Sequence, residues 1–231
     1  AHSFPTRRSS DLYPGYQKVT DPEVRAKFEK AWGVPLSPVN GTPLTHVPDK
    51  VLRESDPKKQ IHAYYIIGED PAQSDPDLPE IRETLSKIDF VVIQDIFFNK
   101  TSEYADVIFP ATAWGEHEAV YSACDRRFQR VHKLVDPDPN VKTDWEILCL
   151  VATAMGYPMH YNNTEEIWDE MISLSPKYYG ATYEKLEANY GIQWPCYTRD
   201  PEDKGTKFLH EGATFNKPEG KGHFYFFPFT P

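Results

Sequence analysis

The chain has 231 residues, a formal charge of −10 and 26% charged residues. This acidic balance excludes a basic surface that follows nucleic acid phosphates, and no apolar run is long enough to cross a bilayer. Length and composition therefore predict a globular chain of one or two domains that neither binds nucleic acid nor inserts into a membrane.

The first twelve residues differ in character from the rest. Residues 2–12, HSFPTRRSSDL, match the translation of a common sequencing adapter in a single reading frame. We therefore predict that residues 1–12 are a foreign segment without tertiary contacts. The same observation predicts that the natural protein extends beyond this chain.

The part that follows predicts one clear helix. Asp21 and Pro22 supply a cap and a first-turn proline, and Gly33 lies where the helix should end. Residues 34–48 are rich in Pro, Asn and Gly and predict a long loop. Residues 48–53 predict a short second helix.

The stretch from residue 61 to residue 110 carries the strongest pattern. Strands are predicted at residues 62–67, 90–93 and 107–109, with a helix over residues 78–88 whose apolar side chains share one face. The continuous apolar run at 90–93 is typical of a parallel strand covered on both faces. Strands alternating with helices predict a doubly wound parallel sheet of the α/β class.

Polar residues follow each predicted strand. Gly68 and Asp70 follow the first, Gln94 the second, and Ala111 and Thr112 the third. Ligands of such sheets bind outside the carboxyl ends of the strands, and these groups suit a purine or a ribose. The alternative is that they are ordinary turn residues, since Gly and Asp favour turns anyway.

Residues 114–129 predict a connecting stretch. Its paired arginines, at 126–127, are expected to brace the loop through ion pairs to Glu116 or Glu118.

Cysteine and histidine spacing predicts no metal site. Cys124, Cys149 and Cys196 are far apart and form no C-x-x-C pair. His117 and His132 lack partners at ligand spacing, which favours structural roles. Cysteine usage permits a cytoplasmic location without requiring it, and a periplasmic one stays open.

Capped helices follow. Thr143 and Glu146 form the pattern of a capping box, and Asp144 falls in the first turn, where the helix dipole favours a carboxylate. Helices are also predicted over residues 165–172 and 182–190. The apolar segment at 223–229 predicts a buried stretch leading toward a further domain.

Several motifs in a fixed order resemble a known family. The stretches GEDPAQSDPD, QDIFFNKTSEYADVIFPATAWGEHE, DRRFQRVHK and KTDWEI resemble the molybdopterin oxidoreductases. Later stretches, MGYPMHYNNTEEIWDE, YYGATYEKLE and GIQWPC, more narrowly resemble the catalytic subunit of molybdenum- or tungsten-dependent formate dehydrogenases. The similarity runs from about residue 13 to the end.

The resemblance implies a domain organisation and an activity. Residues 13–113 would form half of a dinucleotide-cradling α/β domain, and residues 114–231 a connecting loop, capped helices and part of a second α/β domain that leads to a missing C-terminal domain. The full-length parent would oxidise formate to carbon dioxide and pass electrons to a partner subunit or carrier. The chain alone is expected to be inactive.

The resemblance also implies cofactors and the residues that contact them. These are two molybdopterin guanine dinucleotides on molybdenum or tungsten, and a [4Fe-4S] cluster whose cysteine motif is expected outside these residues, as are the metal ligand and the catalytic residues. Matching the motifs residue by residue places cofactor contacts at Gly68, Asp70, Ser74, Gln94, Ala111 and Asp144. Asp144 matches an aspartate that contacts a guanine. Ala111 stands where a serine can occur, so only its backbone amide would serve.

Two alternatives remain open. One is another enzyme of the family, such as a nitrate reductase. The other is a respiratory-complex subunit that keeps the fold as a scaffold without cofactor.

Overall fold

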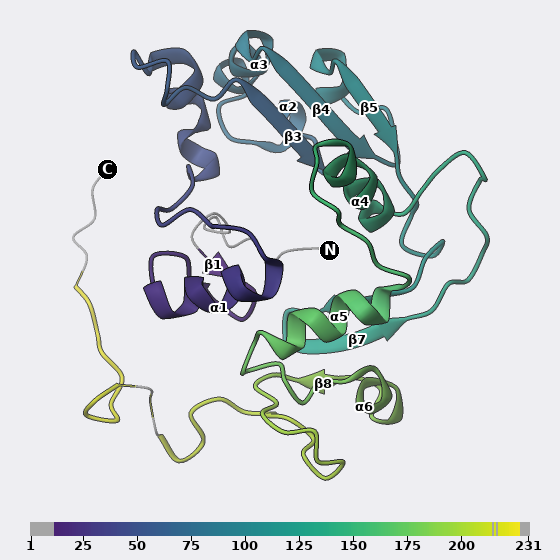
Figure 1. Cartoon of the computed structure of the whole chain (residues 1–231). Helices are drawn as coiled ribbons and strands as arrows, with labels where there is room; N and C mark the ends of the chain where they lie inside the picture. The colour runs from purple at the N-terminus through teal and green to yellow at the C-terminus, as the bar shows by residue number, and fades with distance from the viewer. Residues whose placement is uncertain (1–11, 214, 216, 227–231) are drawn as a thin grey trace.

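The computed structural model describes residues 12–213, 215 and 217–226 and arranges them around two separate sheets (Figure 1). The chain opens with a hairpin of β1 (Leu12–Tyr13) and β2 (Gln17–Lys18). Leu12 pairs with Lys18, so the prediction that residues 1–12 lack tertiary contacts is wrong for Leu12. Residues 1–11 lie outside the described residues.

The first helix, α1 (Pro22–Trp32), confirms the prediction from its capping residues. Asp21 accepts hydrogen bonds from two first-turn amides, and Gly33 ends the helix in the left-handed region at φ 70°. Phe28 is fully buried. The Trp32 indole donates to Glu170 at 2.8 Å, which ties this helix to the later half of the chain.

The parallel sheet contains β3 (Ala63–Ile67), β4 (Phe90–Asp95) and β5 (Val107–Pro110) in that order. The connections contain α2 (Pro71–Ser74) and α3 (Leu78–Lys87), then a 3-10 turn, η4 (Thr101–Tyr104). The predicted parallel sheet and α/β class are confirmed. Among the described residues the three strands follow chain order, without the reversal of a doubly wound sheet.

The two faces of this sheet are covered unequally. On one face Val91 and Ile93 are at most 1% exposed and pack with Leu85 of α3. On the other face Phe90 is 46% exposed and Ile67 is 41% exposed. The prediction that residues 90–93 are covered on both faces is therefore wrong for this chain. The strand alternates between a buried and a partly open side.

A predicted capping box begins α4 (Asp144–Ala154) and is confirmed between Thr143 and Glu146. The segment before it extends the edge of the parallel sheet, because Ala111 forms a parallel bridge with Lys142. The helix thus begins beside the end of β5, and Figure 1 shows it at the carboxyl ends of the strands. This contact positions the first turn of α4 for the site described below.

The later half is built on an antiparallel sheet of β6 (Ala119–Ser122), β7 (Arg127–Val131) and β8 (Ile192–Gln193). The predicted connecting stretch at 114–129 is therefore wrong, since most of it forms the β6–β7 hairpin. Arg126 closes the hairpin at φ 68°. An arginine in the left-handed region gives no turn signal in the sequence.

The predicted arginine ion pairs to Glu116 or Glu118 are wrong as well. The Arg126 guanidinium instead donates to the carbonyl oxygens of Trp194, Thr206 and Lys207. It therefore holds the C-terminal loops against the hairpin, while the neighbouring Arg127 pairs with Asp125.

The two predicted helices are confirmed as α5 (Thr164–Ser173) and α6 (Tyr183–Ala188), and both cover the antiparallel sheet. Phe128 packs edge-on against both Trp168 and Tyr178, with ring centroids 4.9 Å apart in each pair. Aromatic pairs in this geometry add about 0.5–1.5 kcal/mol to the free energy of burial. This aromatic cluster is the core of the later half.

The end of the chain differs from its prediction. Phe224 and Phe226 are 103% and 91% exposed, so the apolar segment at 223–229 is not buried where it is described. Residues 227–229 lie outside the described residues. Over the described part of the chain, no helix has the length and apolar character needed to cross a membrane.

The carboxyl edge of the parallel sheet as candidate functional site

Four of the six predicted cofactor residues meet at the carboxyl edge of the parallel sheet. Gly68 follows β3 and its N–H donates to the carbonyl oxygen of Gln94 at 2.8 Å. Gln94 lies near the end of β4, Ala111 follows β5, and Asp144 begins α4. The topology of parallel strands thus brings together residues that are far apart in sequence.

Gln94 is the centre of this edge. Its side chain is fully buried, yet every polar atom has a partner. The Tyr65 hydroxyl donates to Gln94 Oε1 at 2.5 Å, and Gln94 Nε2 donates to Asp144 Oδ1 at 2.6 Å and to the Asp144 carbonyl oxygen at 3.2 Å. A buried amide left without partners costs about 1–3 kcal/mol, so these bonds fix its position. We call Tyr65, Gln94 and Asp144 the amide relay.

The relay ends in a carboxylate that is not fully used. Asp144 is half-buried and stands at the N-terminus of α4, where the helix dipole favours its charge. Gln94 donates to Oδ1, while among the described residues no side chain or amide donates to Oδ2. The carboxylate is therefore held in place with acceptor capacity left for a ligand.

Besides Tyr65, two polar side chains lie close enough to Asp144 for its charge to affect them, His117 and Tyr121. His117 Nδ1 lies 2.8 Å from the Thr112 hydroxyl. Burial lowers the pKa of His117, partly offset by the Asp144 carboxylate, so the ring is neutral at neutral pH. Burial, followed by the charge of Asp144, raises the pKa values of Tyr65 and Tyr121, which keeps both phenols protonated.

Tyr65 was missed in the sequence, although alternation along the strand contains the signal. Residues 65 and 67 of a strand share one face, and Ile67 is the register partner of Gln94. His117 was interpreted as structural, and its bond to Thr112 gives it such a role while leaving it beside Asp144.

Asp70 and Ser74 are not joined to the relay by any hydrogen bond in the described part of the chain. The Asp70 carboxylate accepts from the Thr101 amide at 2.9 Å, the Thr101 hydroxyl at 2.6 Å and the Lys100 amide at 3.2 Å. Ser74 is exposed, and its hydroxyl donates to the Asp70 carbonyl oxygen. Asp70 therefore fastens the start of η4 to the loop after β3.

Gly68 and Ala111 differ from their predicted roles in detail. Gly68 has φ 64°, which favours glycine, but a Cβ there meets open space, so the position needs the conformation rather than a close approach. The Ala111 amide donates to the Asp95 carbonyl oxygen at 3.1 Å. It is therefore not free to serve a ligand, which corrects the expectation that this amide makes the contact.

The edge suits a ligand that presents two N–H donors side by side. An ionised carboxylate is an acceptor only, and the Gln94 amide holds that of Asp144 in a fixed position. Among residues 12–213, 215 and 217–226, no cluster of three or more His, Cys, Asp or Glu side chains is placed to hold a metal ion.

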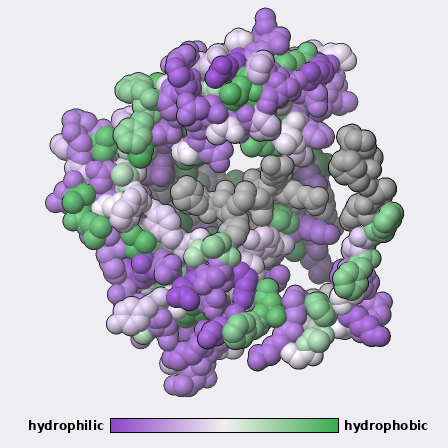
Figure 2. Space-filling model, turned by 180° about the vertical axis from the view of Figure 1, so that it is seen from behind, coloured by the Kyte–Doolittle hydropathy of each residue, from purple (hydrophilic) through white to green (hydrophobic). Residues whose placement is uncertain are grey.

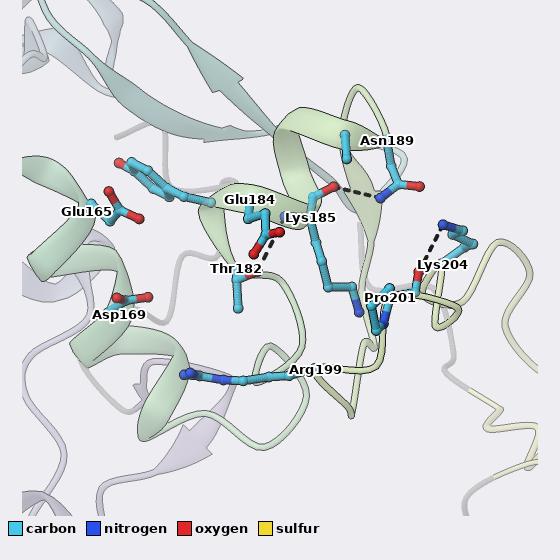
Figure 3. Close-up of a pocket in the computed structure, with 11 residues that line it drawn as sticks. Glu165, Asp169, Thr182, Glu184, Lys185, Asn189, Arg199, Pro201 and Lys204 are labelled. Atoms are coloured by element: carbon cyan, nitrogen blue, oxygen red, sulfur yellow. Dashed lines mark hydrogen bonds between the residues drawn. The ribbon is translucent and has the colours of Figure 1, made fainter.

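A cavity of about 380 Å³ lies away from this edge, between α5, α6 and the loop at 199–204 (Figure 3). Its buried Lys185 is 6% exposed and donates to the carbonyl oxygens of Thr198 at 2.9 Å and Asp200 at 2.8 Å. Arg199 extends toward α5, on the side of Asp169. The Lys185 ammonium thus forms its hydrogen bonds within the protein and stabilises the loop.

Known proteins are similar to this chain, some in sequence and one in fold. Formate dehydrogenase H of Escherichia coli (strain K12) is 48% identical over 93% of the chain, and the F420-dependent formate dehydrogenase subunit alpha of Methanocaldococcus jannaschii is 36% identical over 93%. The chain spans 29% and 30% of the lengths of these two relatives. Acetylene hydratase from Pelobacter acetylenicus shares the fold, with a TM-score of 0.57, 18% identity and coverage of 93% of this chain and 29% of that one.

The family model for molybdopterin oxidoreductases matches residues 37–154, which include the whole parallel sheet and α4. The match covers just over half of the chain and contains all six predicted cofactor residues. The chain therefore belongs to the molybdopterin oxidoreductase family.

Proposed function

We propose that this chain is part of the catalytic subunit of a formate dehydrogenase and forms one wall of the site for a molybdopterin guanine dinucleotide. Its similarity to two proteins named as formate dehydrogenases supports the activity. The match covers under a third of each relative, so the activity belongs to a longer polypeptide. Formate, an electron-accepting partner and a [4Fe-4S] cluster are parts of this proposal.

The observation that carries the proposal is the held carboxylate of Asp144. Gln94 fixes Oδ1 at 2.6 Å, and Oδ2 has no donor among the described residues. A guanine that lies against this edge gives two N–H donors to the carboxylate. Charge-assisted bonds of this kind are worth about 1.5–3 kcal/mol.

The chain's own residues bind and orient, while the bound cofactor supplies the two-electron redox chemistry of formate oxidation through its molybdenum or tungsten. Asp144 would hold the guanine, with Gln94 and Tyr65 keeping its carboxylate in place. The neutral ring of His117 lies close to the same carboxylate without a competing positive charge. A cytoplasmic location stays a prediction.

One observation favours the scaffold alternative. Asp70 and the Ala111 amide, both predicted contacts, are used within the protein. The amide relay disfavours the scaffold alternative. A scaffold has no need of a carboxylate with one oxygen bound by Gln94 and the other available to a ligand. A nitrate reductase-like enzyme is disfavoured by the formate dehydrogenase names of the relatives.

A chimera tests the proposal. Residues 13–226 replace the matching segment of Formate dehydrogenase H of Escherichia coli, whose sequence is 48% identical. We expect the chimera to carry molybdopterin and to oxidise formate with an artificial electron acceptor. A folded chimera with full cofactor and no formate oxidation would contradict the assignment of formate. A folded chimera without cofactor would contradict the proposal that this chain forms one wall of the cofactor site.

A further inference from the structure

We propose that Tyr65 is a positioning residue that holds the Gln94 amide, and through it the Asp144 carboxylate, in the orientation that prefers guanine over adenine. This inference rests on the proposed function and adds a residue that the sequence pattern did not assign. It concerns the relay itself, which the structure describes completely.

The strand geometry places Tyr65 for this task. Tyr65 and Ile67 share the open face of the sheet, and Ile67 is in register with Gln94 of the next strand. Tyr65 itself is in register with Val92, so its phenol reaches along this face toward the carboxyl ends of the strands and donates to Gln94 Oε1 at 2.5 Å. The neighbouring Tyr64 points to the opposite face and packs against the core under α3.

Both ends of the relay favour the same direction. An ionised Asp144 only accepts, so Gln94 must turn its NH₂ group toward it. This turns Oε1 toward Tyr65, whose protonated hydroxyl donates to it. Without that hydroxyl, a fully buried carbonyl oxygen has no partner, so the amide is held less firmly and the Asp144 carboxylate that it orients is less well fixed.

The placement of the carboxylate decides which base fits. Held by the Gln94 amide, it presents only acceptors to the ligand, which matches the N1–H and amine of guanine. Adenine presents an acceptor at N1 beside its amine, so one lone pair faces another. A site built for two donors rejects a ligand that lacks one, because its own polar atom loses a partner. Loosening the amide therefore lowers the preference for guanine.

The test uses the 231-residue chain with GDP and ADP as probes. Three variants are compared with the unchanged chain: Tyr65→Phe, the matched control Tyr64→Phe and the site variant Asp144→Asn. Tyr64 makes no side-chain hydrogen bond within the described residues, and burial raises its pKa to about 12. Calorimetry gives the two dissociation constants, and NMR follows the side-chain NH₂ signals of Gln94, assigned by their loss in Gln94→Glu.

We expect the unchanged chain to prefer GDP and Tyr65→Phe to reduce the ratio of the two affinities by about 5- to 10-fold, the loss from one buried hydrogen bond. The Gln94 signals should shift and exchange faster in Tyr65→Phe only. Tyr64→Phe should change neither readout.

The outcomes separate two failures. If GDP is preferred and Asp144→Asn abolishes the preference, but Tyr65→Phe keeps it, the role of Tyr65 is wrong and the site stands. Unchanged Gln94 signals in Tyr65→Phe overturn the relay whichever nucleotide binds. If the unchanged chain does not distinguish the two nucleotides, guanine recognition fails and the selectivity assigned to Tyr65 falls with it.

Discussion

A buried polar side chain with several hydrogen-bond partners lies in each half of the molecule, Gln94 in the first and Lys185 in the second, and the two differ in where their hydrogen bonds end. Lys185 of α6 ends on the carbonyl oxygens of Thr198 and Asp200, so that network is closed. Gln94 of β4 ends on the Asp144 carboxylate, which keeps an oxygen without a donor in the described structure. A closed network holds a fold together, whereas an open one is available to a ligand.

The packing around the two buried side chains differs as well. The later half packs aromatic rings tightly around Phe128. The parallel sheet is covered on one face and partly open on the other, where Tyr65 and Gln94 lie. Figure 2 shows green, hydrophobic residues scattered among purple ones on the back of the molecule, without separating the halves. The two halves therefore differ in the hydrogen bonds of their buried side chains and not in the hydropathy of this face.

The largest effect is expected from opening the closed network. Lys185→Met removes a buried ammonium that donates to two carbonyl oxygens. Thr198 is left with only the Cys196 thiol at 3.9 Å and Asp200 with only the Asp203 amide at 3.1 Å. We expect a loss of about 2–4 kcal/mol in the free energy of unfolding, measured with urea. GDP binding should not change apart from this loss. Lys204→Met, which removes an exposed lysine bonded to the Pro201 carbonyl oxygen, is the control and should cost under about 0.5 kcal/mol. Equal costs for the two variants would contradict the closed network.

A smaller loss of stability is expected at Asp70. This carboxylate is a predicted cofactor contact, yet its hydrogen bonds are made within the protein. Asp70→Ala removes the acceptor of the Thr101 hydroxyl, a side chain that is fully buried. We expect a loss of about 1–2 kcal/mol in stability and no change in GDP affinity once the folded fraction is matched. A large loss of GDP affinity in stable protein would instead return Asp70 to the set of ligand contacts. Asp169→Ala, at an exposed carboxylate without a hydrogen bond or ion pair within the described residues, serves as the control for charge alone.

Much of the parallel half was predictable from sequence because its signals are local. Strand runs, the caps at Asp21 and Thr143, and the family motifs all lie within a few residues of what they predict. The site was predictable only as a set of candidates. Whether Gln94 faces Asp144 depends on strand order and register, which no short stretch contains.

The failures have equally definite causes. The β6–β7 hairpin was missed because its turn uses Arg126 in the left-handed region in place of glycine or asparagine. Coverage of residues 90–93 on both faces was inferred from apolarity, which cannot say what lies above a strand. The use of Asp70 by Thr101 is a contact between two loops, and so is invisible to periodicity.

The central claim is that Asp144 is the acceptor for a guanine, and Asp144→Asn in the chimeric enzyme tests it most directly. Asn keeps one acceptor oxygen and turns an NH₂ group toward the guanine amine, yet remains acceptable in the first turn of a helix. We predict folded protein whose retention of molybdopterin is weaker by roughly 10- to 150-fold, with activity falling in proportion to cofactor content. Glu146→Gln, in the same turn of α4, should keep full cofactor. Full cofactor and full activity in Asp144→Asn would contradict the claim and leave Asp144 a residue of the helix terminus alone.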